Sequence, residues 1–272
     1  MSVGIPPVSV QSLSLLLGKM LPEPHAGLLS GLLFGTKAAI PQSLYDALVS
    51  TGTLHIIALS GQNIAILVGL LSVLLVPVFG KRVASVICLI LVWSFVLFVG
   101  VSPSVVRASV MASVSLLAVV CGRQYWALGA WAGTVVGMAL IHPGWVGDVS
   151  FLLSSGATLG ILVFGTYNPP KRVPWYLSGI LSDIHLTLSA QVFTIPILLF
   201  VFHRISLISV VSNIAIGWVI APLMVVGWIM IGVGSVVLYG GQVVGWVAWI
   251  FLEYLIRTIQ FFDRIPFASI QW

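Results

Sequence analysis

The 272-residue chain is 60% hydrophobic and only 6% charged. Soluble globular domains carry about 25% charged residues, so this composition excludes a soluble protein and indicates an integral membrane protein. Apolar stretches of about 20 residues recur along the chain, which favours α-helical spans rather than the alternating pattern of an outer-membrane barrel. The net charge of +5 fits basic cytoplasmic loops, and it would also suit an anionic substrate.

The first 50 residues differ from the rest of the chain. Leucines recur at helical spacing in 13–21 and again in 28–33, on either side of Pro22 and Pro24. Both stretches are too short to cross a membrane. We expect short amphipathic helices here, and we assign residues 1–50 to an extracytoplasmic segment and residues 51–272 to a transmembrane domain.

Apolar stretches of spanning length follow one another after this segment. In chain order they are His55–Val76, Val83–Val99, Ser104–Val120, Tyr125–Ile141, Val149–Thr166, Trp175–Phe202 and Val243–Phe262. Leu207–Tyr239 is too long for one straight helix and short for two, and Pro222 lies in its middle. The predicted fold is an all-α, polytopic membrane bundle with about eight spans (roughly 7–9), in which broken or re-entrant helices are allowed.

Basic residues predict how the chain is oriented. Lys81/Arg82, Arg123 and Lys171/Arg172 all follow odd-numbered spans, so they lie on one side of the membrane. By the positive-inside rule that side is cytoplasmic, and the N-terminus is then outside.

Polar residues inside the spans are candidates for an aqueous path. Asp183, Thr187 and Gln191 recur every four residues and share one face of a helix. An ionisable residue inside a membrane is a functional candidate by default, whereas the hydroxyl and amide groups could equally form interhelical hydrogen bonds.

Further polar residues fall at comparable depths in other spans. Ser60 and Asn63 lie in the first span, and Asn213 lies near the start of Leu207–Tyr239. Together with Gln191 they suggest a polar chamber in the outer half of the membrane.

Arg107 lies in the third span, about 6 Å from its outer end at 1.5 Å per residue. It could snorkel outward, pair with Asp148 at the start of the fifth span, or contact an anionic substrate.

Four blocks of the sequence resemble the competence domain of the ComEC family, the bacterial DNA-uptake channel of natural transformation. They are GLLFGTKAAIPQSLYDALVSTGTLHIIALSGQNIAIL (Gly31–Leu67), SPSVVRASVM (Ser102–Met111), GDVSFLLSSGATLGIL (Gly147–Leu162) and SAQVFTIPILLFVFHRISLISVVSNIAI (Ser189–Ile216). Asn63 and Leu152 stand where many relatives have His and Gln, so roles that depend on those two side chains are not carried to this chain.

The resemblance implies a channel that passes single-stranded DNA into the cytoplasm across the bacterial cytoplasmic membrane. Its implied partners are DNA, membrane lipids, a nuclease domain or subunit, a DNA receptor and a cytoplasmic DNA-translocating ATPase. The metallo-β-lactamase-like nuclease domain of full-length relatives is absent from this sequence, so we expect no enzyme activity, no metal and no cofactor. The predicted path-lining residues are His55, Ser60, Gly61, Asn63, Arg107, Asp148, Ser154, Asp183, Thr187, Gln191 and Asn213.

Two other functions are weighed against the channel. Ser60-Gly61 is also found in membrane-embedded serine proteases, and His185 could act as the base of an intramembrane serine hydrolase if the two side chains lie within about 3 Å. A helix broken at Pro222 would suit a small-solute transporter, but the sequence has no visible inverted repeat.

Overall fold

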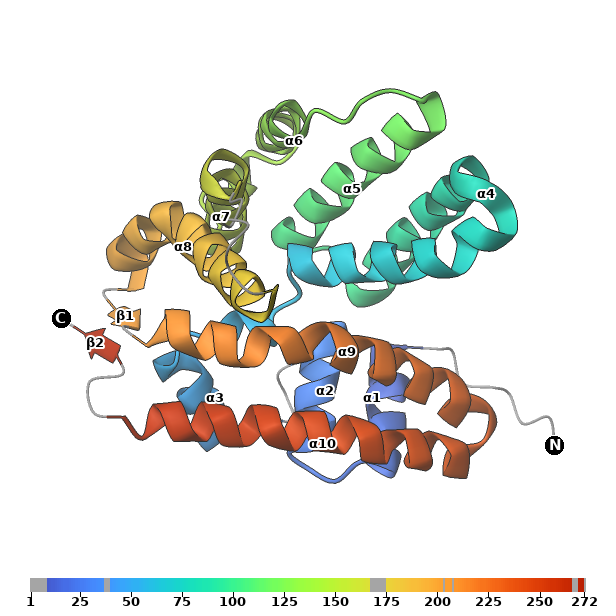
Figure 1. The fold of residues 1–272 in the computed structure, drawn as a ribbon, viewed down its shortest axis with the longest axis vertical. Helices are drawn as coiled ribbons and strands as arrows, with labels where there is room; N and C mark the ends of the chain where they lie inside the picture. Colours follow the sequence, from blue (N-terminus) through green and yellow to red (C-terminus); the bar gives the residue numbers. More distant parts are fainter. Residues whose placement is uncertain are drawn as a thin grey trace. The chain divides into compact units, whose positions relative to one another are not determined.

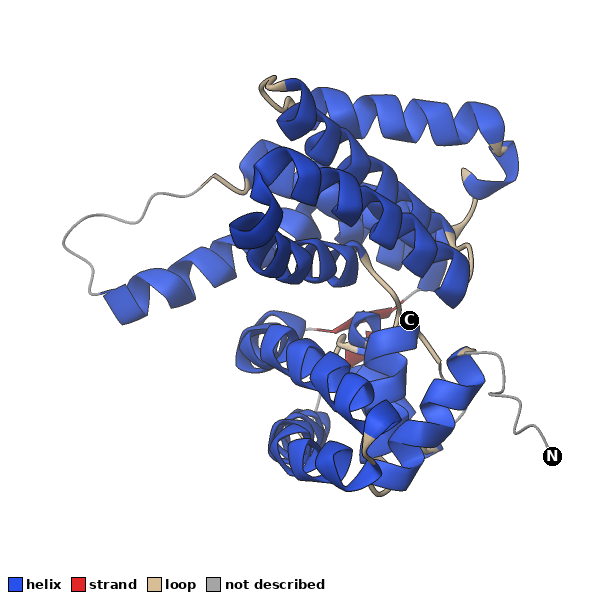
Figure 2. Ribbon diagram, turned by 90° about the vertical axis from the view of Figure 1, so that its right-hand side faces the viewer, coloured by secondary structure: helices blue, strands red, loops and turns tan. Residues whose placement is uncertain are grey.

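The computed structural model describes residues 9–36, 40–166, 175–202, 204–206, 208–265 and 269–271. Most of these residues lie in helices (Figures 1 and 2). Two three-residue strands, β1 (Arg204–Ser206) and β2 (Ser269–Gln271), form one antiparallel pair. The predicted all-α membrane fold is confirmed, because this strand pair is too short to form a layer of its own.

The chain folds into two compact units. Unit 1 comprises Met1–Leu59 and Ile216–Ile265, and unit 2 comprises Ser60–Ala215 and Pro266–Trp272. The predicted boundary at residue 50 stays a prediction, because the units are defined by contacts and not by position in a membrane.

Unit 1 combines short N-terminal helices with long C-terminal ones. Its elements are α1 (Val10–Met20), α2 (His25–Phe34), α3 (Gln42–Ser50), the 3-10 turn η1 (Leu54–Ile56), the part of α9 (Ser209–Val236) that begins at Ile216, and α10 (Leu238–Asp263).

Helix α2 is the centre of unit 1, and every one of its residues is buried. Leu29 and Leu33 lie against Gly227 of α9, where a Cβ would come within 3.1 and 3.0 Å of their methyl groups. Phe34 meets Trp228 edge-on, with ring centroids 5.7 Å apart. The predicted amphipathic character is therefore wrong for α2, since other helices surround it; α1 buries one face only.

Unit 2 contains the remaining helices. They are α4 (Gly61–Val99), α5 (Pro103–Cys121), α6 (Ala127–Ile141), the 3-10 turn η2 (Pro143–Trp145), α7 (Val149–Phe164), α8 (Trp175–Phe202) and the first turns of α9.

Helix α4 bends sharply at Gly80, whose φ of 73° and ψ of 164° are not helical. Ser72 Oγ and Cys88 Sγ are 4.0 Å apart, whereas 16 residues of straight helix would separate them by about 24 Å. The two arms, 61–79 and 81–99, therefore fold back on each other as a hairpin (Figure 1). Two predicted spans correspond to these arms, although the first begins at Gly61 rather than His55 and continues through Pro77.

Close helix packing holds α7 against α8. A Cβ on Gly160 would lie 2.1 Å from the carbonyl oxygen of Ser189, and a Cβ on Gly156 would lie 3.3 Å from Ile197. Small residues let two backbones approach in this way, which supplies dispersion contacts where lipid offers no hydrophobic driving force.

The predicted count of about eight spans is not confirmed. Among the described residues, five helices are long and apolar enough to cross a membrane: α4, α5, α8, α9 and α10. At 15 and 16 residues, α6 and α7 are shorter than the roughly 20 residues that a span needs. Helix α9 runs through Pro222 as one 28-residue helix, so the predicted break there is wrong.

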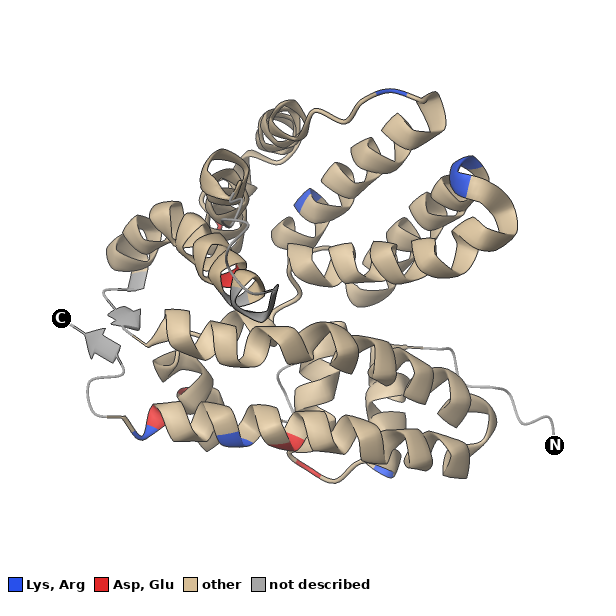
Figure 3. Ribbon diagram, in the orientation of Figure 1, with Lys and Arg blue, Asp and Glu red and all other residues tan. Residues whose placement is uncertain are grey.

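Two of the three basic clusters lie at the same end of the α4–α5 pair (Figure 3). Trp93 Nε1 donates to Ser113 Oγ at 3.0 Å, which fixes the antiparallel register between the second arm of α4 and α5. In this register Lys81/Arg82 and Arg123 fall at one end and Arg107 falls towards the other. Lys171/Arg172 lie outside the described residues.

Candidate functional site

The amino-terminal ends of α4, α5 and α7 meet in unit 2. Arg107, the fifth residue of α5, contacts Ser154, the sixth residue of α7, so these two helices begin at the same end. Gly61, the first residue of α4, lies beside Arg107. Each helix amino end carries a partial positive charge of about half an elementary charge. The meeting point is therefore electropositive before any side chain is counted.

Arg107 is the central residue of this site, and its exposed fraction is only 3%. Its Nε and Nη2 donate to Ser154 Oγ at 3.1 and 2.6 Å, and Nη1 lies 3.3 Å from Met111 Sδ. Within the part of the chain that the structure describes, no carboxylate lies within 4 Å of the guanidinium. The cation is buried against neutral partners, an arrangement that costs free energy unless an anion arrives.

Two of the three alternatives for Arg107 are therefore wrong. A side chain that is 3% exposed does not snorkel outward. Asp148 does not pair with it either, because Asp148 Oδ1 instead accepts the backbone N–H of Phe151 at 3.0 Å and caps the start of α7. A capping carboxylate at this position offsets the positive helix end. Contact with an anionic substrate remains as a prediction.

Gly61 brings α4 close to Arg107. A Cβ at this position would lie 3.3 Å from Arg107 Nη2 and 3.5 Å from Ala108 Cβ, so a larger residue would require the guanidinium to shift by a few tenths of an ångström. Ser60 Oγ donates to Asn63 Oδ1 at 3.2 Å, and Asn63 is 3% exposed. Ser60 and Ser102 precede α4 and α5 without capping them through their side chains.

His55 belongs to the other unit of the chain. It lies in η1 of unit 1, is exposed, and has Nδ1 3.3 Å from the Gly52 carbonyl oxygen. The chain leaves α3 through a turn at Gly52, whose φ is +71°, so residues 51–60 do not continue into a spanning helix. The prediction placed Ser60 and Asn63 along a helix that starts near Thr51, whereas α4 starts at Gly61; their depth in the membrane stays a prediction.

The polar face of α8 also lies apart from Arg107. His185 Nε2 bonds to the Phe164 carbonyl oxygen at 2.6 Å, and Ser189 is buried against α7. Asp183 lies about 200° around the helix from His185, so it faces away from α7 and is exposed. Thr187 Oγ1 donates to the Asp183 carbonyl oxygen at 2.8 Å, which is a local bond within the helix.

Gln191 lies on α8, and Asn213 lies in the second turn of α9. Gln191 Nε2 donates to Ser209 Oγ, one turn before Asn213, at 3.2 Å. Asn213 Oδ1 is buried without a hydrogen-bond partner among the described residues. The structure therefore brings together Ser60, Gly61, Asn63, Arg107 and Ser154, with Asp148 as the cap of the helix that carries Ser154. The described contacts of Asp183, Thr187, Gln191 and Asn213 do not include this cluster, and His55 belongs to unit 1.

The geometry does not form the serine–histidine pair that a hydrolase needs. Ser60 donates to Asn63, and no described histidine is its hydrogen-bond partner. Clusters of three or more His, Cys, Asp or Glu side chains that could hold a metal ion are likewise not found in the described ranges.

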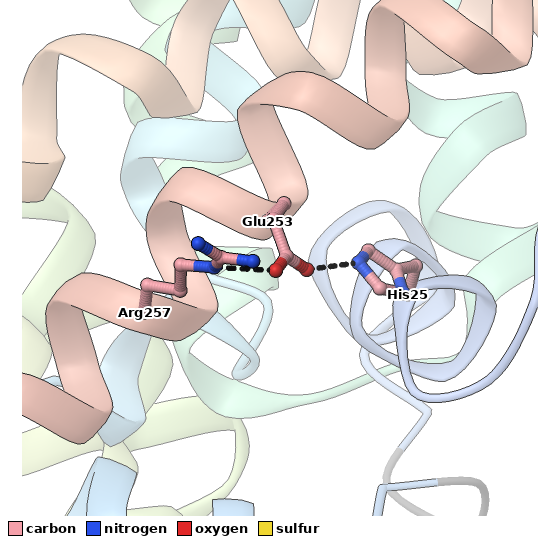
Figure 4. A network of polar contacts seen from close by, with 3 residues as sticks. All are labelled: His25, Glu253 and Arg257. Carbon is pink, nitrogen blue, oxygen red and sulfur yellow. Dashed lines mark hydrogen bonds and ion pairs between the residues drawn. The ribbon is translucent and has the colours of Figure 1, made fainter.

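A polar network of His25, Glu253 and Arg257 in unit 1 was not predicted from the sequence (Figure 4). His25 Nε2 is 2.9 Å from Glu253 Oε2, and Glu253 Oε1 accepts from Arg257 Nε at 2.6 Å. The His25 ring also stacks on Trp249, with centroids 5.6 Å apart. The i,i+4 spacing of Glu253 and Arg257 predicts an ion pair between them on a helix. The contact between Glu253 and His25 could not be predicted from the sequence, since 228 residues separate the partners.

Comparisons with known proteins identify the family. A model described as "Competence protein" matches residues 32–272. ComE operon protein 3 of Bacillus subtilis (strain 168) is 26% identical over 195 residues, which cover 71% of this chain and 24% of that protein. The uncharacterized protein YcaI of Escherichia coli (strain K12) is 25% identical over 210 residues, covering 71% and 27%.

The chain thus spans about a quarter of the length of these curated relatives. No solved structure matches it significantly. The family match covers most of the chain, including both the Arg107 cluster of unit 2 and the C-terminal helices of unit 1. With five long apolar helices and this match, the chain is a multi-pass membrane protein that belongs to the competence protein family.

Proposed function

We propose that this chain forms part of a path by which single-stranded DNA crosses the bacterial cytoplasmic membrane, and that its role is conduction without chemistry. Membership of the competence protein family supports a role in DNA uptake. The proposal of a path for single-stranded DNA rests on Arg107, which is a buried cation with no carboxylate partner among the described residues.

The phosphate backbone is the part of DNA that every sequence shares. Every nucleotide presents one negative charge, so a path that conducts any sequence must recognise phosphate and not bases. Ser154 is neutral and leaves the Arg107 charge uncompensated, and a phosphate oxygen could replace it as the acceptor. The amino ends of α4, α5 and α7 add positive potential at the same point.

The orientation of the α4–α5 pair supports a position for Arg107 near the outer entrance. Lys81/Arg82 and Arg123 lie at the opposite end of this pair (Figure 3). If the basic end is cytoplasmic, as the positive-inside rule predicts, Arg107 lies on the outer side and the N-terminus is outside. DNA would then meet Arg107 first and the cytoplasmic basic residues last.

If the chain only conducts DNA, other proteins must deliver the strand, prepare it and move it. A path for one strand needs a receptor that delivers DNA outside, a nuclease domain or subunit that supplies the single strand, and a cytoplasmic ATPase that draws it in. Membrane lipids surround the exposed apolar helices. None of these activities is assigned to the chain itself.

Uptake of single-stranded DNA by reconstituted vesicles tests the proposal. The protein is inserted into liposomes, fluorescent DNA is added outside, and DNA protected from added nuclease is measured. Arg107→Gln removes the charge, and Arg123→Gln removes an exposed arginine from the same helix pair as a matched control. Loss of one charge-assisted contact, worth about 1.5–3 kcal/mol, should lower the rate about 10-fold or more for Arg107→Gln only.

Arg107→Lys sharpens the result, because a lysine keeps the charge but not the fork of donors. We expect Arg107→Lys to take up DNA at a rate between those of wild type and Arg107→Gln. Equal uptake by wild type and Arg107→Gln, at equal levels of inserted protein, would exclude Arg107 from the path.

A further inference from the structure

An open cavity of about 370 Å³ lies in unit 1, and none of the residues that line it belongs to the Arg107 cluster. It is lined by α1, α2 and the segments at both ends of α2. Its polar residues are Gln11, Ser14, Glu23, Ser30 and Thr36. Ligand cavities begin at about 300 Å³, so this one can hold a small ligand or a single side chain of a partner.

Three hydroxyl groups form a chain along the cavity wall. Ser14 Oγ donates to the Val10 carbonyl oxygen at 2.9 Å, and the contacts from Ser14 to Ser30 and from Ser30 to Thr36 are both 2.6 Å. Each hydroxyl has one proton, and a carbonyl oxygen can only accept. All three contacts form together only if Thr36 donates to Ser30, Ser30 to Ser14, and Ser14 to Val10. The hydroxyls then offer the cavity lone pairs and no protons.

One carboxylate adds negative charge to this wall. Glu23 Oε2 accepts the backbone N–H of Gly27 at 3.0 Å. Glu23 Oε1 has no hydrogen-bond partner, and Glu23 forms no ion pair, in the described part of the chain. Glu23 is exposed at the mouth of the cavity. Acceptor oxygens beside a carboxylate that has no ion-pair partner in the described chain favour a cation with several N–H donors and disfavour phosphate. The cavity is therefore unsuited to DNA.

We infer that this cavity binds a primary ammonium group, carried either by a lysine of a partner protein or by a small free amine. An ammonium is a compact charge with three donors, which suits acceptors that come from separate segments: Glu23 before α2, Thr36 after it, and Gln11 on α1. A planar guanidinium is bound most strongly by two acceptors in one plane, and the acceptors here come from separate segments. The site makes no use of Arg107 and goes beyond the proposed DNA path.

Calorimetric titration of the purified, detergent-solubilised chain tests the inference. The probes are n-butylammonium, N-acetyl-lysine methylamide and tetramethylammonium, which carries the same charge without N–H donors. The first two should bind and the third should not. Glu23→Gln, which keeps an acceptor for the Gly27 N–H, should weaken binding about 10-fold, since a charge-assisted bond becomes a neutral one.

Asp46→Asn is the matched control, because Asp46 is an exposed acid on α3 in the same unit and bonds only to Gln42 in the described chain. Tighter binding of the lysine amide than of butylammonium would identify a partner's lysine as the source, and the reverse order would identify a free amine. Binding of tetramethylammonium equal to that of the amines, or no loss on Glu23→Gln, would overturn the inference.

Discussion

His25 in unit 1 and Arg107 in unit 2 are both buried basic side chains within apolar helices, but their partners differ. His25 has a carboxylate at 2.9 Å, and that carboxylate is shared with Arg257. Arg107 has a serine hydroxyl and a methionine sulfur. Breaking a buried ion pair is strongly destabilising, whereas a buried charge without a counter-ion already costs free energy. The His25–Glu253 contact therefore holds α2 against α10, whereas the Arg107 guanidinium is available to an anionic ligand.

The largest effect on DNA uptake is expected when a carboxylate is placed beside Arg107, as Glu253 lies beside His25. In Ser154→Asp the new side chain would neutralise the guanidinium, so phosphate would have to displace an ion pair. Uptake of single-stranded DNA in the vesicle assay should fall about 10- to 100-fold, the equivalent of about 1.5–3 kcal/mol. Ser150→Asp adds the same charge at an exposed position of the same helix and should change uptake by less than about 2-fold. Equal losses in both variants would show that only net charge matters.

The second-largest effect is expected in unit 1, where the carboxylate beside His25 is removed instead of added. Glu253→Gln removes the charge that pairs with His25 and Arg257, and it should lower the free energy of unfolding by about 2 kcal/mol, less than the 3–5 kcal/mol of a fully buried pair. Partial exposure of Glu253, at 23%, is the reason for the smaller figure. Thermal unfolding in detergent measures it, with Asp46→Asn as the exposed-acid control. An unchanged midpoint for Glu253→Gln would mean that this network does not stabilise unit 1.

A smaller effect is expected where α4 approaches Arg107. Gly61→Val would place side-chain carbon within contact of Arg107 Nη2 and Ala108, and α4 would have to move away. We expect DNA uptake to fall about 3-fold, which corresponds to less than 1 kcal/mol. Gly69→Val on the same arm meets nothing within 4 Å and serves as the control. Similar uptake by the two variants would show that the close approach at Gly61 is unimportant.

The smallest effect is expected at Asp148. Asparagine is also a good helix cap, so Asp148→Asn should keep the bond to the Phe151 N–H and change stability by less than about 0.5 kcal/mol. DNA uptake should stay within about 2-fold of wild type, since Asp148 does not neutralise Arg107. A strong change in uptake, measured beside Asp46→Asn, would indicate a coupling between Asp148 and Arg107 that the geometry does not show.

Local sequence pattern was enough to predict α5 and α8 closely. Pro103 begins α5 and Gly122 ends it, and α8 has the predicted bounds Trp175–Phe202. These limits depend on neighbouring residues alone: proline fits the first helical turn, and glycine adopts the left-handed conformation that ends a helix. Where a limit depended on distant contacts, the prediction failed, as at the start of α4.

The opening of α4 shows why. TGTLHIIALSGQNIAIL reads as one apolar helix, yet its first half belongs to unit 1 and its second half to unit 2. Hydropathy records how apolar a stretch is, but not which neighbours bury it. The same limit hid the burial of α2, whose Leu29 and Leu33 pack under Gly227 nearly 200 residues later.

By itself, the sequence determined that the chain is a helical membrane protein, where most helices lie, and that Arg107 is a charged residue inside an apolar stretch, because composition and spacing act locally. Only the tertiary structure decided which polar groups share a site. It paired Arg107 with Ser154 across 47 positions, placed Gly61 beside them, and left Asp148 as a helix cap. The reason is physical: the cost of a buried charge depends on what lies within a few ångströms of it, and that is set by how helices pack.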